Sequence, residues 1–283
     1  MTAIAFGLLT ALLWAASNLA SARSVRSIGQ YSVVAWVMLV GTVVTVPFTI
    51  AAGIPSGITG SQVLGLATIG AVVVAGLLLM YAGLRVGKVT VVAPIVATEG
   101  AFAAVISALT GEALAPIVLA LLLLVVAGVV LSTLAPDPVP VADERPVAAA
   151  LFALAGAAMF GVGLFLSGRL SSDLPLAWVL LPPRIVGTVV LFLPLLILGK
   201  LRISRQALPL VISTGCTEVL GFAAFAIGAQ SSLATVAVLA SQVSTFTVIG
   251  GRLFFREKLG RLQAAGILVV IVGVTSLAIL RSS

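Results

Sequence analysis

The sequence predicts an all-α polytopic membrane protein in which ten transmembrane helices form two inverted five-helix repeats around a central cavity. Hydrophobic residues make up 61% of the 283 positions and charged residues only 8%, against about 25% charged in a typical soluble domain. Mean hydropathy is +1.31, and apolar runs of about 20 residues, enough for a bilayer-spanning helix, recur throughout. The alternating stretches of a membrane β-barrel are absent from the sequence. Helices are therefore expected, because they satisfy their own backbone hydrogen bonds in lipid.

Charged and turn-forming residues separate the predicted spans. The first half has apolar segments at about residues 3–21, 31–52, 63–85, 88–110 and 114–134. No basic leader or cleavage site precedes the first segment, which is expected to be a retained span. A polar linker at residues 135–146 contains four prolines and four charged residues. The second half has segments at about residues 147–170, 176–199, 206–228, 231–253 and 260–281.

Composition excludes several kinds of chemistry. The chain has no histidine, which rules out HExxH zinc sites, His-ligated haem and catalytic Ser-His or Cys-His pairs. Cys216 is the single cysteine, so neither an intramolecular disulfide nor a cysteine metal cluster can form. No GxxxxGK[ST] loop is present for ATP binding. We expect no cofactor or metal, and we attribute the net charge of +7 to basic helix ends in a membrane, not to nucleic-acid binding.

The two halves show signs of internal duplication. A shift of 146 residues aligns Gly41-Thr42-Val43-Val44 with Gly187-Thr188-Val189-Val190, Arg23 with Arg169, and Trp14 with Phe160. A shift of 145 residues aligns Gly83 with Gly228, Thr90 with Thr235, Glu112 with Glu257, and Gly128 with Gly273. Five spans per half place the halves in opposite orientations, the inverted-repeat plan of secondary transporters. The predicted repeats are residues 1–134 and 147–283, joined by the linker at 135–146.

Each predicted half ends in a similar motif. Residues 83–114 read GLRVGKVTVVAPIVATEGAFAAVISALTGEAL, and residues 250–274 read GGRLFFREKLGRLQAAGILVVIVGV. Over nearly the whole chain the plan resembles the EamA-type transporters of the drug/metabolite transporter superfamily, whose halves each end in a helix, a Gly-Glu turn and a Gly-containing last helix. Two positions depart from that pattern: Arg256 stands where glycine is usual before the turn glutamate, and Glu99 stands where proline is common.

This resemblance implies a secondary transporter that exports small metabolites by alternating access, and its amino-acid exporter branch suggests amino acids and their analogues as substrates. It also implies a bacterial inner membrane location, with a small-molecule substrate and the bilayer as partners; the oligomeric state is left open and is compatible with a monomer. Another metabolite or drug class, a channel-like module and a membrane-embedded lipid-modifying enzyme are the alternatives. The enzyme is disfavoured because Asp137, Asp143 and Asp173 all lie in predicted loops. The first span has Trp14 and Asn18 but no acid, which disfavours cationic-drug antiport.

Two acidic residues fall near the midpoints of predicted spans. A charge at the bilayer centre costs roughly 2.5–3.5 kcal/mol on insertion scales, so Glu99 and Glu218 each need a reason to be there. Transporters bind substrates near the midplane, where a carboxylate can accept an ammonium group or take up a proton. We interpret both residues as substrate-binding and coupling candidates. The alternative is a protonated glutamate that bonds a neighbouring helix. Arg184, in the same region, can meet a substrate carboxylate, pair with Glu218 or extend to the nearer membrane surface, and the last role is favoured.

Aromatic and polar side chains complete the candidate substrate site. Trp14, Ser17 and Asn18 share one helical face, and Phe160 is the repeat partner of Trp14. Anchoring or packing is the alternative role for the aromatic residues, and bonding between helices is the alternative for the polar ones. The full predicted set is Trp14, Asn18, Tyr81, Glu99, Phe160, Glu218, Ser241 and Gln242. Glu112 and Glu257 are instead predicted to cap the last helix of each half.

The distribution of basic residues predicts the membrane orientation. Connections after the first, third, fifth, seventh and ninth spans hold twelve lysines and arginines, whereas the opposite side holds only Arg169 and Arg281. Short basic loops stay in the cytoplasm. We therefore predict both termini on the periplasmic side, although members of the resembled family usually keep both in the cytoplasm.

Overall fold

The computed structural model describes residues 2–55, 57–111, 116–134, 144–171 and 173–282, in which all regular structure is helical. The first half contains α1 (Thr2–Ile28), α2 (Gln30–Ala52), α3 (Gly60–Val86), α4 (Val89–Val96), α5 (Glu99–Leu109) and α6 (Pro116–Leu134). The second half contains α7 (Pro146–Leu170), α8 (Leu176–Gly187), a π-helical turn (Thr188–Phe192), α9 (Leu193–Ile197), α10 (Ala207–Ala240), α11 (Val243–Phe254) and α12 (Arg261–Ser282).

The described helices are those of an integral membrane protein. Seven helical segments are long and apolar enough to cross a bilayer, and three shorter apolar helices accompany them. The all-α membrane class is thus confirmed, whereas the count of ten spans stays a prediction. The predicted linker at residues 135–146 lies mostly outside the described residues, and α7 begins at its last position, Pro146.

Two predicted spans are broken helices. The segment predicted at residues 88–110 divides into α4 and α5 at Ala97 and Thr98, where the Thr98 amide bonds the Ile95 carbonyl three residues back, at 3.1 Å. The Thr98 hydroxyl donates to the same carbonyl at 2.7 Å. In the second half, Gln242 makes the equivalent three-residue bond to Leu239, at 3.1 Å, between α10 and α11. Broken helices at matching repeat positions are typical of transporter binding sites.

The predicted boundary between spans at residues 228 and 231 is not a helix end, because α10 continues to Ala240. The chain nevertheless turns back within α10. In a straight helix, residues eight positions apart are separated by about 12 Å. A Cβ placed on Gly228 would instead lie 2.6 Å from Cγ2 of Val236. The reversal that the sequence predicts therefore takes place between these two residues.

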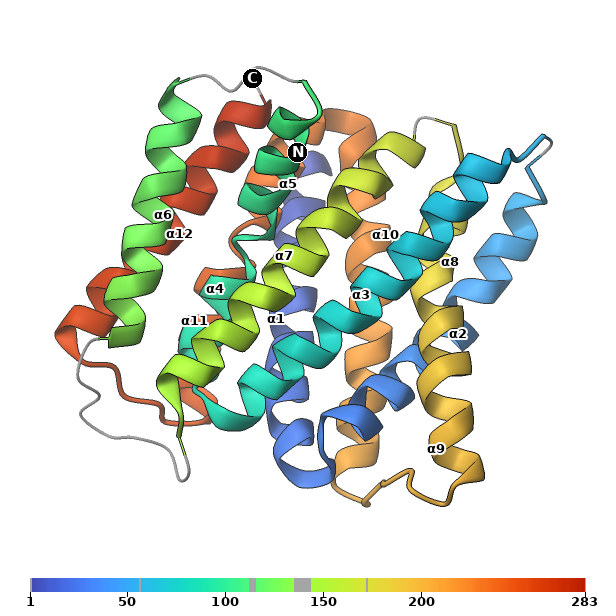
Figure 1. Ribbon diagram of the computed structural model, residues 1–283, viewed down its shortest axis with the longest axis horizontal. Coiled ribbons are helices and arrows are strands. Elements are labelled where there is room, and N and C mark those ends of the chain that lie inside the picture. The colour runs from blue at the N-terminus through green and yellow to red at the C-terminus, as the bar shows by residue number, and fades with distance from the viewer. Residues whose placement is uncertain (1, 56, 112–115, 135–143, 172, 283) are drawn as a thin grey trace.

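Contacts between the halves follow the repeat offset. Thr42 and Thr188, which are 146 positions apart, join their hydroxyl groups at 3.0 Å. Several close contacts of glycines occur twice, once between two residues and once between the repeat partners of those residues. Three such pairs of contacts are Gly76 with Phe160 and Gly221 with Trp14, Gly41 with Arg184 and Gly187 with Met38, and Gly128 with Val270 and Gly273 with Val125. Likewise α1 packs on α10, α3 on α7, and α6 on α12 (Figure 1). This pattern is that of a bundle with an internal two-fold pseudosymmetry.

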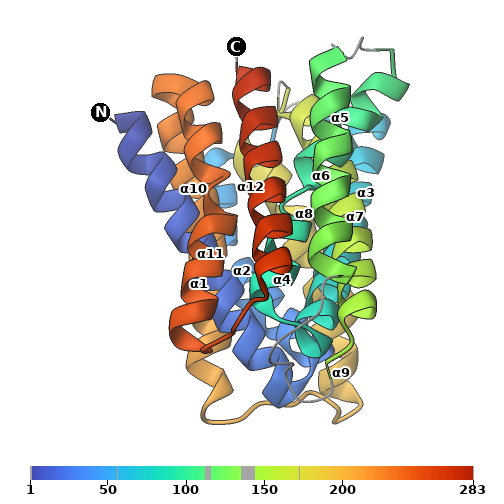
Figure 2. The same cartoon turned by 90° about the vertical axis from the view of Figure 1, so that its left-hand side faces the viewer.

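The two ends of the bundle differ in charge. Both termini lie at one end, here called the terminal face, and the start of α4 and the connection from α11 to α12 lie at the other, here called the basic face (Figure 2). Helices α1, α3 and α11 end at the basic face, and α7, α10 and α12 begin there. The basic residues of these ends are Arg23, Arg26, Arg85, Lys88, Arg145, Lys200, Arg202, Arg205, Arg252, Arg256, Lys258 and Arg261.

We predict that the basic face lies in the cytoplasm, with both termini in the periplasm, because short basic loops resist translocation. A C-terminal alkaline phosphatase fusion should be active in cells and a C-terminal GFP fusion should be dark. The same reporters inserted in the linker at residues 135–143 should give the opposite pattern. A fluorescent C-terminal GFP with an inactive phosphatase fusion would refute the prediction.

Candidate functional site

A cavity of about 720 Å³ lies between the halves, within the range of roughly 300–1,000 Å³ for small-molecule sites. Side chains from α1, α3, α4, α5, α7, α8, α10, α11 and α12 line it. Its lining reaches Ser171 and Leu176, which are exposed at the terminal face, and extends inward to the buried Tyr81, Ala93 and Arg184. The cavity is therefore open towards the terminal face and closed towards the basic face.

Seven of the eight predicted site residues line this cavity: Trp14, Asn18, Tyr81, Glu99, Phe160, Glu218 and Ser241. Gln242 does not. Its amide nitrogen donates to the Thr275 hydroxyl at 3.1 Å, and its amide oxygen accepts from the Thr245 hydroxyl at 3.2 Å. Gln242 is the N-cap residue of α11, and the helix break turns its side chain towards α12 while the preceding Ser241 faces the cavity.

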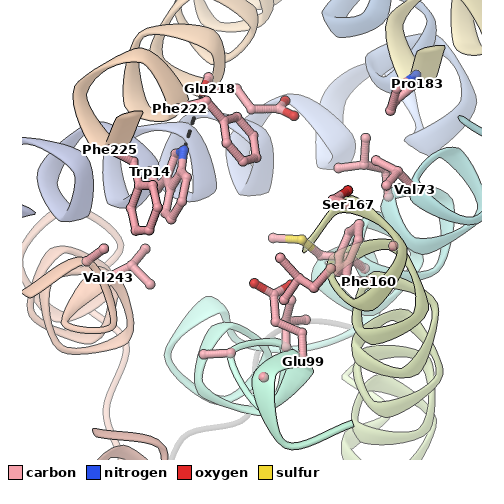
Figure 3. Close-up of a pocket in the computed structure, with 18 of the residues that line it drawn as sticks. Trp14, Val73, Glu99, Phe160, Ser167, Pro183, Glu218, Phe222, Phe225 and Val243 are labelled. Atoms are coloured by element: carbon pink, nitrogen blue, oxygen red, sulfur yellow. Dashed lines mark hydrogen bonds between the residues drawn. The ribbon is translucent and has the colours of Figure 1, made fainter. Parts of the chain in front are cut away.

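Glu99 is the first residue of α5, not the middle of one continuous helix. The break at Ala97 and Thr98 thus sets the direction of its side chain, and Figure 3 shows the carboxylate facing the cavity, across from Trp14. Within the described part of the chain, its carboxylate has no hydrogen bond or ion pair. A helix N-terminus stabilises a carboxylate through its unsatisfied amides and dipole. The position at the start of α5 therefore leaves the Glu99 carboxylate available to a ligand.

Glu218 is paired, and its partner corrects the interpretation favoured for Arg184. The Arg184 guanidinium contacts the Glu218 carboxylate at 3.0 Å and lies 5.5 Å from the Phe222 ring centre. Only 2% of the arginine side chain and 14% of the glutamate side chain are exposed. Arg184 does not extend to the membrane surface. If it did, the buried Glu218 carboxylate would lose its partner, which costs free energy of folding. Among the described residues that line the cavity, Glu99 is then the one charged residue without an oppositely charged partner in the described part of the chain.

An aromatic wall lies beside Glu218. The indole of Trp14 packs edge-on against Phe222, with ring centres 5.0 Å apart, and stacks with Phe225 at 6.4 Å. Its N–H donates to the Glu218 backbone carbonyl at 3.4 Å, drawn as a dashed line in Figure 3. Phe222 and Phe225 were missed by the sequence reasoning. Their positions four and seven residues after Glu218 place them on its helical face, which is the signal that could have found them.

The inner end of the cavity is held by polar contacts. Tyr81 is buried there, and its hydroxyl accepts a hydrogen bond from the Ser21 hydroxyl at 2.9 Å. The Asn18 amide donates to the Thr247 hydroxyl at 3.3 Å. These bonds join α1 to α3 and α1 to α11. Hydrogen bonds among these three helices therefore hold together the inner end of the cavity.

Glu257 does not cap the helix that follows it. Its carboxylate accepts from the backbone amides of Val89 at 3.2 Å and Thr90 at 3.0 Å, and from the Thr90 hydroxyl at 2.9 Å. It therefore caps α4 in the other half, and the start of α12 is met instead by Gln263, which accepts from the Gly260 amide at 3.0 Å. Tertiary packing thus replaces the local cap that the sequence predicts. Glu112 lies outside the described residues.

Arg256 is strained by the same turn. It has φ 54°, whereas the matching Gly111 has φ 105°. This region of φ raises the conformational free energy of a residue with a Cβ by roughly 1–2 kcal/mol. We predict that Arg256→Gly raises the free energy of unfolding by about 0.5–1 kcal/mol, after the entropy of glycine is subtracted. Thermal unfolding in detergent checks this, with Gly199→Ala, at φ 62°, as a control of opposite sign. A lower melting temperature for Arg256→Gly would contradict it.

Comparisons with known proteins bear on the whole chain. Residues 1–134 and 147–279 match the family described as "EamA-like transporter family". A solved crystal structure resembles the chain with a TM-score of 0.64 and 18% sequence identity, over 99% of this chain and 97% of the other. At this identity the likeness shows the fold alone. Comparison with curated proteins gives no significant match.

Proposed function

The chain belongs to the EamA-like transporter family, and from this premise we propose that it is a secondary transporter that exports amino acids and related small metabolites by alternating access. The family consists of membrane transporters of small solutes. Amino acids as substrates, the outward direction and the bacterial inner membrane are our proposals. The observation that carries the substrate class is the carboxylate of Glu99, which faces the cavity without a partner.

A substrate ammonium group suits the Glu99 carboxylate. Hydrogen bonds between charged groups are short and roughly twice as strong as neutral ones, and the apolar surroundings strengthen them further. Across the cavity, Trp14, Phe222 and Phe225 offer an apolar wall to the rest of the substrate. The pair of Arg184 and Glu218 is neutral as a unit, so it does not cancel the negative charge of Glu99.

Alternating access requires the closed inner end to open. Rocking of one half against the other exposes a central site to each side in turn in inverted-repeat transporters. The breaks between α4 and α5 and between α10 and α11 are positions where the backbone can change direction. Pro182 and Pro183, followed by the π-helical turn Thr188–Phe192, offer a third. These irregular segments support the proposed motion.

Transport by purified protein in liposomes tests the proposal. Labelled amino acids, sugars and organic cations are compared, with and without a proton gradient, and empty liposomes serve as the control. We expect saturable flux of at least one amino acid or amine-bearing analogue. Saturable flux of sugars or organic anions alone would overturn the proposed substrate class, and a proton-gradient effect would identify the coupling ion.

We predict that Trp14→Ala changes substrate selectivity. The indole fills the space beside Phe222 and Phe225, so its removal widens the cavity and should raise the rate for bulky relative to small substrates severalfold. Relative initial rates in liposomes measure this. Trp36→Ala is the matched control, because Trp36 does not line the cavity and donates its indole N–H to the Arg202 carbonyl at 3.1 Å. An equal change in rate for every substrate would show that Trp14 serves only packing.

A further inference from the structure

The inner end of the cavity is closed by contacts between charged residues of the two halves. We propose that Arg26, Lys88 and Glu257 form a gate at the basic face, and that this gate biases the resting protein towards the conformation open at the terminal face. The inference rests on the proposed function, because a gate has meaning only in a carrier. It adds which contacts must break and which conformation is the more populated.

Glu257 provides the central contact of the gate. It belongs to the connection from α11 to α12, yet its carboxylate takes up the first amides of α4, at Val89 and Thr90. Only 6% of Glu257 is exposed, and both α4 residues are fully buried. Because α4 contributes Ala93 and Val96 to the cavity lining, the capped end of this helix lies directly behind the cavity.

Two cations close the remaining gap. The Arg26 guanidinium donates to the Gly87 carbonyl at 2.9 Å and lies 3.6 Å from the Glu257 carboxylate. The Lys88 ammonium donates to the Lys258 carbonyl at 2.7 Å, and only 1% of Lys88 is exposed. Arg26 and Lys88 belong to the first half, whereas Glu257 and Lys258 belong to the second. A path from the cavity to the basic face has to separate these groups.

The repeat partners of the gate residues differ from them in sequence. Glu257 has a repeat partner in Glu112, and Thr90 has one in Thr235, so the acid and the hydroxyl are present in both halves. The partners of Arg26 and Lys88, at offsets of 146 and 145, are Ser172 and Leu233. The repeat partners of the two gate cations are therefore uncharged, whereas a cation of the terminal face, Arg169, is the partner of Arg23 and donates to the Thr110 hydroxyl at 3.4 Å.

This asymmetry has a consequence for the conformational equilibrium. If both gates were identical, exchanging the halves would give two conformations of equal free energy. Contacts that exist in only one conformation shift the population towards it. The contacts of Arg26 with Glu257 and of Lys88 with the Lys258 carbonyl join the two halves, so they are made only while the basic face is closed. The conformation open at the terminal face is thus favoured until substrate binding lowers the free energy of the other conformation.

The test replaces the two cations of the gate by the residues that stand at their repeat-partner positions. Arg26→Ser and Lys88→Leu are combined in a background in which Cys216 is replaced by serine. Spin labels are attached at Ser27→Cys and Lys258→Cys, exposed positions of the two halves beside the gate. Pulsed electron paramagnetic resonance then gives the distribution of distances in liposomes. Arg23→Ser with Arg85→Leu is the matched control. It also removes two positive charges, but from positions of α1 and α3 outside the gate.

Without the substitutions, we expect mainly the short distance between the labels. The gate variant should raise the long-distance fraction at least fivefold, and the control should leave it unchanged. An unchanged distribution in the gate variant, or an equal rise in the control, would overturn the gate. If the double variant does not purify as a monodisperse protein, Glu257→Gln replaces it with the same criteria. No substrate is needed, so this outcome is independent of whether amino acids are transported.

Discussion

Replacing Glu99 by glutamine is expected to reduce transport by about 10- to 100-fold. A hydrogen bond to a charged group contributes about 1.5–3 kcal/mol, and each 1.4 kcal/mol corresponds to about tenfold in an equilibrium. Glutamine keeps the size of the side chain and removes its charge. The loss should therefore appear in the affinity for ammonium-bearing substrates, whereas folding should be preserved, because no other described residue depends on this carboxylate.

Initial rates in liposomes, over a range of substrate concentrations and on both sides of neutral pH, measure the effect of Glu99→Gln. Glu144→Gln, an acid outside the cavity, is the matched control and should transport normally. Normal transport by Glu99→Gln under every condition would remove this residue from the substrate site. Loss of proton dependence together with retained affinity would assign Glu99 to coupling instead.

Replacing Arg184 by methionine is expected to destabilise the protein by about 3 kcal/mol. Removing one partner of a buried ion pair leaves an uncompensated charge and typically costs about 3–5 kcal/mol. The lower end applies because 14% of the Glu218 side chain remains exposed to the cavity. The double variant Arg184→Met with Glu218→Gln removes both charges, so most of the lost stability should return.

Thermal unfolding of the four proteins of this double-mutant cycle, in one detergent, gives the coupling energy between the two residues. A favourable coupling of about 2 kcal/mol or more is expected. Strictly additive losses would show that Arg184 stabilises the protein through its packing on Gly41 and Phe222 and not through Glu218. Transport by the double variant then shows whether the pair also contacts substrate.

Features that depend on the pattern of a single chain could be predicted from the sequence. Apolar runs defined the helices, and the repeat offset reappears in the contacts of Gly76 with Phe160 and Gly221 with Trp14. Mid-span polar and aromatic residues pointed to the cavity because charge and hydrogen-bonding groups need a reason to lie within lipid. This reasoning located Glu99, Glu218, Trp14 and their neighbours on one cavity.

Features that depend on tertiary partners could not be predicted. Glu257 follows a turn, so local reasoning assigned it to the next helix, whereas packing brings the start of α4 to it. The helix break sets the side of α11 on which Gln242 lies. The rotation of the chain at this break cannot be read from the spacing of residues in the sequence. Phe222 and Phe225 were overlooked because phenylalanine is common in any membrane helix, and only the position of Glu218 marks their face as a lining.

Counterflow in liposomes tests whether the cavity carries amine-bearing metabolites across the membrane by alternating access. Liposomes loaded with an unlabelled amino acid are diluted into trace amounts of the same labelled compound. We expect transient accumulation of label above its external concentration, which saturates with substrate and is reduced about 10- to 100-fold by Glu99→Gln. Label that only equilibrates, at a rate proportional to concentration and unaffected by unlabelled substrate on the other side, would contradict this expectation.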